Sequence, residues 1–106
     1  NVKGIAHITG GGLTENLPRI ISKNLSIKLN LKNLPNCNLF SWFKKIAKLN
    51  DKEMLSTFNC GIGMALIISK NDLKKIQKFL KNNNEKFFVI GNIVKTIKNE
   101  ERCIIA

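Results

Sequence analysis

Three consecutive glycines, Gly10–Gly12, directly follow a short apolar segment, Val2–Thr9. Three glycines in a row lose more backbone entropy on folding than almost any other triplet. Chains keep such a triplet where the backbone passes through positive φ, or where a ligand approaches bare peptide. We therefore predict a strand over Val2–Thr9, a glycine turn and a short helix capped by Thr14 or Asn16. Because proline is tolerated only in a first helical turn, Pro18 predicts a start near Asn16, or a one-turn 3₁₀ piece before it.

A glycine turn between a strand and a helix has the features of an anion site. Its N–H groups are exposed, and the helix dipole adds positive potential. A plain tight turn is the competing interpretation, since no complete G-x-G-x-x-G or P-loop pattern identifies a ligand. His7, the only histidine, lies three residues before the glycines. Imidazole titrates near neutral pH, so His7 is a candidate proton carrier, although a lone histidine on an apolar strand is more often structural.

The rest of the chain mixes predicted strands and helices, with no internal repeat. Strands are expected over Ser26–Leu31, Ala65–Ile68, Lys86–Ile97 with an interruption at Gly91, and Cys103–Ala106. Helices are expected over Leu39–Leu49, from Asp51 through Leu55, and from Asn71 or Asp72 to Leu80. This order predicts an α+β fold in which a mixed β-sheet is covered by helices.

Three expectations concern packing. The continuous apolar strand Ala65–Ile68 should be covered on both faces. The last strand should form a hairpin with the strand before it, across a polar turn over Lys98–Arg102. One stripe of the helix at 39–49 should lie in the core. Its members are Leu39, Trp42, Phe43, Ile46 and Ala47.

The net charge of +11 is typical of nucleic-acid-binding proteins. However, Lys, Asn and Ile contribute 16, 15 and 15 of the 106 residues, a joint excess that AT-rich codons explain. The lysines are spread along the chain, and only two residues are arginine, which bidentate phosphate contacts favour. We expect no specific nucleic-acid binding, and a basic binding module is the alternative from a different functional class.

The cysteines and the apolar runs exclude further classes of protein. Cys37, Cys60 and Cys103 are odd in number and widely spaced, which fits neither a disulfide framework nor a zinc site. We therefore expect no metal site and reduced thiols, as in a cytoplasmic protein. The longest apolar run, Ile62–Ile68, is too short to span a bilayer, so no membrane partner is expected.

A second unusual segment is Thr57–Met64, in which Asn59 and Cys60 precede two glycines spaced two apart. Its backbone is open to close approach, although a bulge or a packing contact explains the glycines equally well. No second histidine is present to activate Cys60 as a nucleophile, so we do not expect covalent catalysis there.

Segments 4–19 (GIAHITGGGLTENLPR) and 53–64 (EMLSTFNCGIGM) closely resemble the C-terminal domain of the aminoimidazole ribonucleotide synthetases, the phosphoribosylformylglycinamidine cyclo-ligases. The resemblance covers the whole chain. It implies that residues 1–106 are a single C-terminal domain fragment of a longer two-domain enzyme, lacking the first strand and helix of that domain. Related ATP-dependent enzymes of the same fold, of the amidotransferase or selenophosphate synthetase type, are the alternative. The amidotransferases have a run closer to Asp-x-Ser-x-Gly-Gly, which differs from His7-Ile-Thr9 and its three glycines.

The resemblance implies an ATP-driven ring closure of formylglycinamidine ribonucleotide to aminoimidazole ribonucleotide. ATP would phosphorylate the formyl amide oxygen, because that oxygen is otherwise a poor leaving group; the amidine nitrogen then attacks, and phosphate leaves. ATP and Mg²⁺ would be bound mainly by an N-terminal domain that also forms a homodimer. The fragment alone would hold no cofactor and be inactive. Its role would be to bind the nucleotide substrate, with His7 as the candidate catalytic residue. The implied phosphate and substrate contacts are Thr9, Gly10, Gly11, Gly12, Asn16, Arg19 and Asn59.

Overall fold

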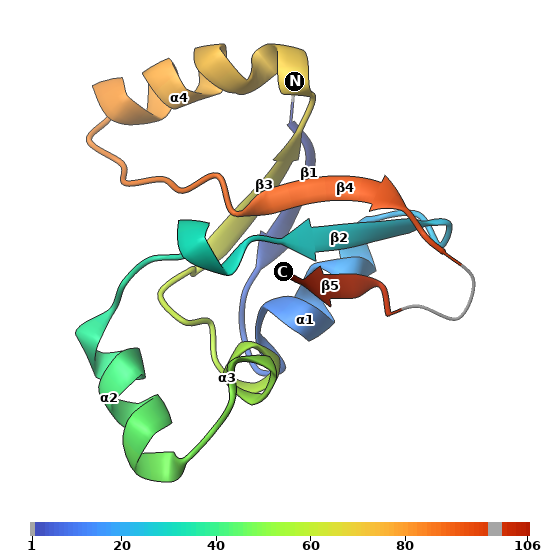
Figure 1. Ribbon diagram of the computed structural model, residues 1–106. Coiled ribbons are helices and arrows are strands. Elements are labelled where there is room, and N and C mark those ends of the chain that lie inside the picture. Colours follow the sequence, from blue (N-terminus) through green and yellow to red (C-terminus); the bar gives the residue numbers. More distant parts are fainter. Residues whose placement is uncertain (1, 98–100) are drawn as a thin grey trace.

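Two small β-sheets share one hydrophobic core in the computed structural model, which describes residues 2–97 and 101–106 (Figure 1). In the first sheet, β1 (Val2–His7) pairs antiparallel with β3 (Met64–Ile68). In the second, β2 (Leu25–Leu29) is central, antiparallel to β4 (Gly91–Lys95) and parallel to β5 (Cys103–Ile105). The α+β prediction is confirmed, but the single mixed sheet is resolved into one antiparallel and one mixed sheet.

The helices divide into a packed pair and two peripheral ones. Helix α1 (Gly12–Asn16) packs against α3 (Asp51–Thr57), whereas α2 (Asn38–Ala47) and α4 (Leu73–Asn82) lie at the periphery (Figure 1). The connections contain the 3₁₀ turns η1 (Pro18–Ile20), η2 (Leu31–Asn33) and η3 (Lys70–Asp72). None of the helices in the described part of the chain is long and apolar enough to cross a membrane.

The core is built from side chains of both sheets, of α1 and α3, and of the segment before β3. Its buried members are Ala6, Ile8, Leu13, Leu17, Ile27, Leu29, Leu55, Ile62, Ala65 and Cys103. On the other face of β2, the polar Ser26 is also fully buried and its hydroxyl lies 2.8 Å from that of Thr96, whereas Lys28 is exposed. Ala6 of β1 and Leu13 of α1 both belong to this core, so the glycine loop joins two elements that are anchored in it.

The start of α1 differs from the prediction. The helix begins at Gly12, because Gly11 and Gly12 adopt φ values of 92° and 61° and turn the chain at once into a helical path. Pro18 then begins the separate turn η1 after α1, where its missing N–H is not needed. The 3₁₀ piece therefore follows the α-helix, and neither Thr14 nor Asn16 caps it.

The prediction of a C-terminal hairpin is also wrong. Strands β4 and β5 lie on opposite sides of β2, so they do not pair with each other. The N–H of Ile27 donates to the carbonyl of Arg102 (2.7 Å) and that of Ala106 to Leu29 (2.9 Å), which completes the free edge of β2. The expected strand over 86–97 is paired only over Gly91–Lys95, and residues 98–100 of the expected turn lie outside the described residues.

Two faces expected in the core are exposed in this chain. Strand β3 is covered on one face only, since Met64 and Leu66 are 62% and 38% exposed. The apolar stripe of α2 also points outward, with Trp42 58% exposed. Within this stripe, Phe43 makes an aromatic contact, since it meets Phe58 edge-on at a centroid distance of 5.3 Å. The helices therefore leave the outer face of the first sheet uncovered.

Candidate functional site

The glycine loop is held in shape by its own backbone. The N–H of Gly12 donates to the carbonyl of Thr9 at 3.0 Å, which closes a tight turn. Gly11, in the left-handed region, is the residue before α1. Among the described residues, the N–H groups of Gly10 and Gly11 donate to no acceptor. Two adjacent N–H donors at the tip of the loop are therefore left for solvent or a ligand.

Asn16 holds this loop from inside the protein. Its side chain is buried, and Nδ2 donates to the carbonyl of Gly12 at 2.7 Å. The carbonyls of Gly10 and Thr9 lie 3.3 and 3.4 Å from the same nitrogen. Arg19 is exposed and donates from Nη1 to Asn16 Oδ1 at 3.4 Å. Asn16 thus positions the loop, and substrate contacts from Asn16 and Arg19 stay predictions.

The second motif meets the loop through the β1–β3 pairing. The N–H of Ile8 donates to the carbonyl of Gly63 at 2.9 Å, which extends the ladder beyond β1. Asn59 folds its own segment, since Oδ1 accepts from the N–H of Gly61 at 2.9 Å. Cys60 and Gly61 both have positive φ, 52° and 93°. The glycine at 61 thus serves a sharp turn that directs the chain into β3.

A hollow of about 210 Å³ lies where these two segments meet. It is lined by Ile8, Thr9, Gly10, Phe40, Thr57, Phe58 and Asn59. The fold thus brings together three of the predicted site residues, Thr9, Gly10 and Asn59, from motifs that are about fifty residues apart in the sequence. The hollow combines apolar walls with loop backbone, which suits a small ligand carrying one polar group.

The three glycines of the loop have different reasons to be glycine. A Cβ at Gly10 would meet no atom within 4 Å, and Gly10 does not have positive φ. A Cβ at Gly11 would overlap the flexible side chain of Glu15. A Cβ at Gly12 would overlap the main-chain oxygens of Leu55 and Phe58. Gly12 is therefore required by the packing of α1 on α3, whereas only Gly10 has open space in front of it.

His7 lies apart from this hollow. It is exposed at the end of β1, opposite Met64 of β3, on the face that points away from the buried Ala6. It is not among the residues that line the hollow. The structure thus places the only histidine beside the loop but on the outer face of the sheet, and its catalytic role stays a prediction.

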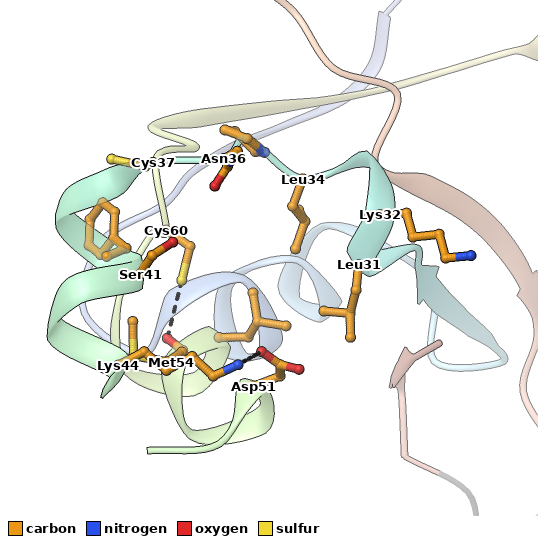
Figure 2. A pocket seen from close by; sticks show the side chains of 13 residues that line it. Leu31, Lys32, Leu34, Asn36, Cys37, Ser41, Lys44, Asp51, Met54 and Cys60 are labelled. Carbon is orange, nitrogen blue, oxygen red and sulfur yellow. Dashed lines mark hydrogen bonds and ion pairs between the residues drawn. The ribbon is translucent and has the colours of Figure 1, made fainter. Parts of the chain in front are cut away.

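A larger hollow, about 330 Å³, lies between η2, α2 and α3 (Figure 2). Lys44 and Asp51 face each other there as an ion pair, and the Cys60 thiol donates to the carbonyl of Met54 at 3.5 Å. Burial, followed by the charge of Asp51 and the neighbouring Cys37, raises the pKa of the Cys60 thiol. The thiol is therefore protonated at neutral pH, in line with the absence of an activating base.

Sequence reasoning missed this larger hollow. Its walls come from three short, unrelated segments, and Lys44 and Asp51 follow ordinary patterns of a solvated helix face and an acidic first turn. Within residues 2–97 and 101–106, no three histidine, cysteine or acidic side chains gather closely enough to hold a metal ion.

The chain is similar to known proteins along nearly its whole length. A family model described as "AIR synthase related protein, C-terminal domain" matches residues 1–103. The chain is 41% identical to a phosphoribosylformylglycinamidine cyclo-ligase of Ligilactobacillus salivarius over 98% of its own length and 30% of that protein. A bifunctional purine biosynthetic protein of Dictyostelium discoideum is 42% identical over 98% of this chain and 13% of its own length. The trifunctional purine biosynthetic protein adenosine-3 of Homo sapiens is 37% identical over 96% and 10%. The chain thus spans a third or less of the relatives that it matches.

Proposed function

Because the chain belongs to the family of AIR synthase related proteins, as their C-terminal domain, we propose that it is the substrate-binding part of a phosphoribosylformylglycinamidine cyclo-ligase. The proposed reaction is the ATP-dependent closure of formylglycinamidine ribonucleotide to aminoimidazole ribonucleotide. The relative from Ligilactobacillus salivarius is named as a cyclo-ligase, which supports this enzyme over the amidotransferase and selenophosphate synthetase types. A cytoplasmic location follows from the proposed pathway and is part of the same proposal.

The observation that carries the proposal is the meeting of the two motifs at one hollow. Thr9 and Gly10 from the first motif and Asn59 from the second line it together. The N–H groups of Gly10 and Gly11 donate to no acceptor within the described residues. Backbone N–H groups are strong donors to a phosphate oxygen, and a glycine at position 10 lets that oxygen come close. We assign the ribose 5′-phosphate of the substrate to this loop.

We also propose that ATP and Mg²⁺ are bound mainly by the N-terminal domain of the whole enzyme, which also makes the homodimer contact, as the family resemblance implies. This chain's share of the reaction is to bind the substrate by its phosphate and to orient the formyl amide and the amidine nitrogen. The isolated 106-residue chain is expected to be inactive.

The test uses the full-length protein. Formylglycinamidine ribonucleotide and ATP are supplied, and aminoimidazole ribonucleotide and ADP are measured by mass spectrometry. Formation of both products in equal amounts supports the proposal. Parallel reactions with formylglycinamide ribonucleotide plus glutamine, or with selenide, cover the two related enzyme types. Turnover only in one of these parallel reactions would refute the cyclo-ligase assignment.

Binding of the full-length protein to a generic oligonucleotide separates the enzyme from a basic binding module. We expect weak binding without sequence preference, because the lysines are spread along the chain and only two residues are arginine. Tight binding that falls steeply with salt, without any turnover, would favour the binding module instead.

A further inference from the structure

The outer face of the β1–β3 sheet is mostly apolar, with His7 as its polar member. Ile5 lies opposite Leu66, and His7 lies opposite Met64. Ile5, Leu66 and Met64 are 57%, 38% and 62% exposed. The inner face of the same ladder is tightly covered, since the paired residues Ala6 and Ala65 are 5% and 8% exposed. Strand alternation therefore produces a second, largely apolar face that the described chain leaves substantially exposed.

The sheet that carries this face has only two strands, β1 and β3. Two-stranded sheets are marginal on their own and become stable when further strands or a helix cover them. Strand β3 is also a continuous apolar run, MALII, which is the composition of a strand buried on both faces. Composition and topology therefore both indicate that this sheet is completed by another part of a protein.

Two occupants of this face are consistent with an apolar surface, a second copy of the chain and the remainder of the same polypeptide. A second copy brings a net charge of +11 toward another +11, and this repulsion opposes self-association. The remainder of the polypeptide is large, because the chain spans 30% of the cyclo-ligase of Ligilactobacillus salivarius. It is also covalently attached, so its effective concentration at this face is high whatever the protein concentration.

We infer that the outer face of the β1–β3 sheet, formed by Ile5, His7, Met64 and Leu66, is the surface on which the remainder of the same polypeptide packs. This inference rests on the proposed function, in which the chain is one domain of a longer enzyme. Because His7 is two residues from Thr9, the covered face ends where the glycine loop begins. The remainder of the polypeptide would thus cover His7 beside the loop, on the face of the sheet that points away from the buried Ala6.

The test measures thiol protection in the full-length protein. Met64→Cys is the test variant, and Lys75→Cys is the matched control, because Lys75 is exposed on the charged side of α4. Each variant is treated with iodoacetamide in the native state and in urea, and peptide mass spectrometry follows the introduced cysteine apart from the native ones. We expect position 64 to react at least tenfold more slowly than position 75 in the native protein, and at the same rate in urea. Leu66→Cys repeats the test if Met64→Cys lowers the yield of folded protein.

Each outcome decides the inference. Equal native rates at positions 64 and 75 would refute it, since the face would then be open to solvent. Protection at position 64 that disappears when the protein is diluted a hundredfold would also refute it, because that result identifies a second copy as the occupant. Protection that is independent of concentration supports it. The labelling does not require turnover, so a protein that protects position 64 without closing the ring would overturn the proposed activity and leave this packing surface intact.

Discussion

Gly10→Ala should weaken substrate binding without lowering stability, and Gly12→Ala should do the reverse. At Gly10 a Cβ meets no atom within 4 Å, so the folded state should change by less than about 0.5 kcal/mol. The added methyl group would, however, stand where a phosphate oxygen approaches the loop. Loss of one hydrogen bond to a charged group costs about 1.5–3 kcal/mol, which is roughly a 10- to 150-fold increase in Kd.

At Gly12 the structure predicts a different cost. An alanine at φ 61° is destabilised by about 1 kcal/mol. Its Cβ would also overlap the carbonyl oxygens of Leu55 and Phe58, and separating α1 from α3 to relieve this overlap costs roughly 1–3 kcal/mol. The sum of about 2–4 kcal/mol corresponds to a fall in melting temperature on the order of 10 °C for a domain of this size.

The assay measures substrate affinity by calorimetry and melting temperature by circular dichroism, both on the full-length protein. Gly63→Ala is the matched control, because a Cβ there also meets nothing within 4 Å and Gly63 does not line the hollow. We expect its affinity and melting temperature to equal those of the unchanged protein. If Gly10→Ala binds the substrate as tightly as Gly63→Ala does, the loop is only a turn and the assignment of the phosphate to it is refuted.

Three further predictions concern stability and pH. Asn16→Ala should lower the free energy of unfolding by about 1–3 kcal/mol in urea titrations, because the buried amide that holds the loop carbonyls is lost; an unchanged midpoint would contradict this role. Ser26→Ala should cost about 1 kcal/mol by the same measurement, with little further loss in the double variant Ser26→Ala/Thr96→Val, since the two hydroxyls are partners. Burial, with a smaller contribution from Glu101, raises the pKa of Cys103 from 9.0 to about 11. The free energy of unfolding should therefore be unaffected by this thiol below pH 9 and fall between pH 9 and 11, because only the unfolded chain loses the proton there. A fall of the same size in Cys103→Ala would assign the pH dependence to other groups.

Local patterns located most of the secondary structure. The alternation of Ile27 and Leu29 predicted β2, where both side chains are buried. The acidic first turn predicted α3, which has a capping box in which Asn50 and Glu53 exchange hydrogen bonds of 2.8 and 3.1 Å. These features were predictable because hydrophobic periodicity, helix caps and turn residues determine the local backbone conformation within a few residues of the chain.

Pairing between distant strands was not predictable in the same way. Cys103–Ile105 was expected beside the strand that precedes it, but it pairs with β2 in parallel. Both edges of a central strand offer the same N–H and C=O groups, and the sequence alone does not say which strand takes which edge. Helix α2 shows the same limit, since only part of its amphipathic stripe packs: Phe43 and, outside the stripe, Phe40 contact Phe58, whereas Trp42 is exposed.

The candidate site combines both kinds of information. The glycine run and the segment Asn59–Gly63 were identified from the sequence, because unusual local composition is visible without a fold. That Thr9 and Asn59 line one hollow, that Asn16 turns inward to hold the loop, and that His7 points to the other face all depend on strand register and on helix packing. The roles within the run were equally hidden, since a Cβ at Gly12 meets carbonyls of α3, about forty residues away.

The sequence by itself determined the family of this chain, the positions of most helices and strands, and the two segments that carry the site. These properties depend on residue types and spacings within short stretches, where backbone conformation and hydrophobic period are local. Only the tertiary structure decided which apolar faces are buried and which are left open. The continuous apolar strand β3 predicted two covered faces, yet the structure covers only one. Burial is a property of what lies opposite a side chain, and the described chain leaves Met64 and Leu66 62% and 38% exposed.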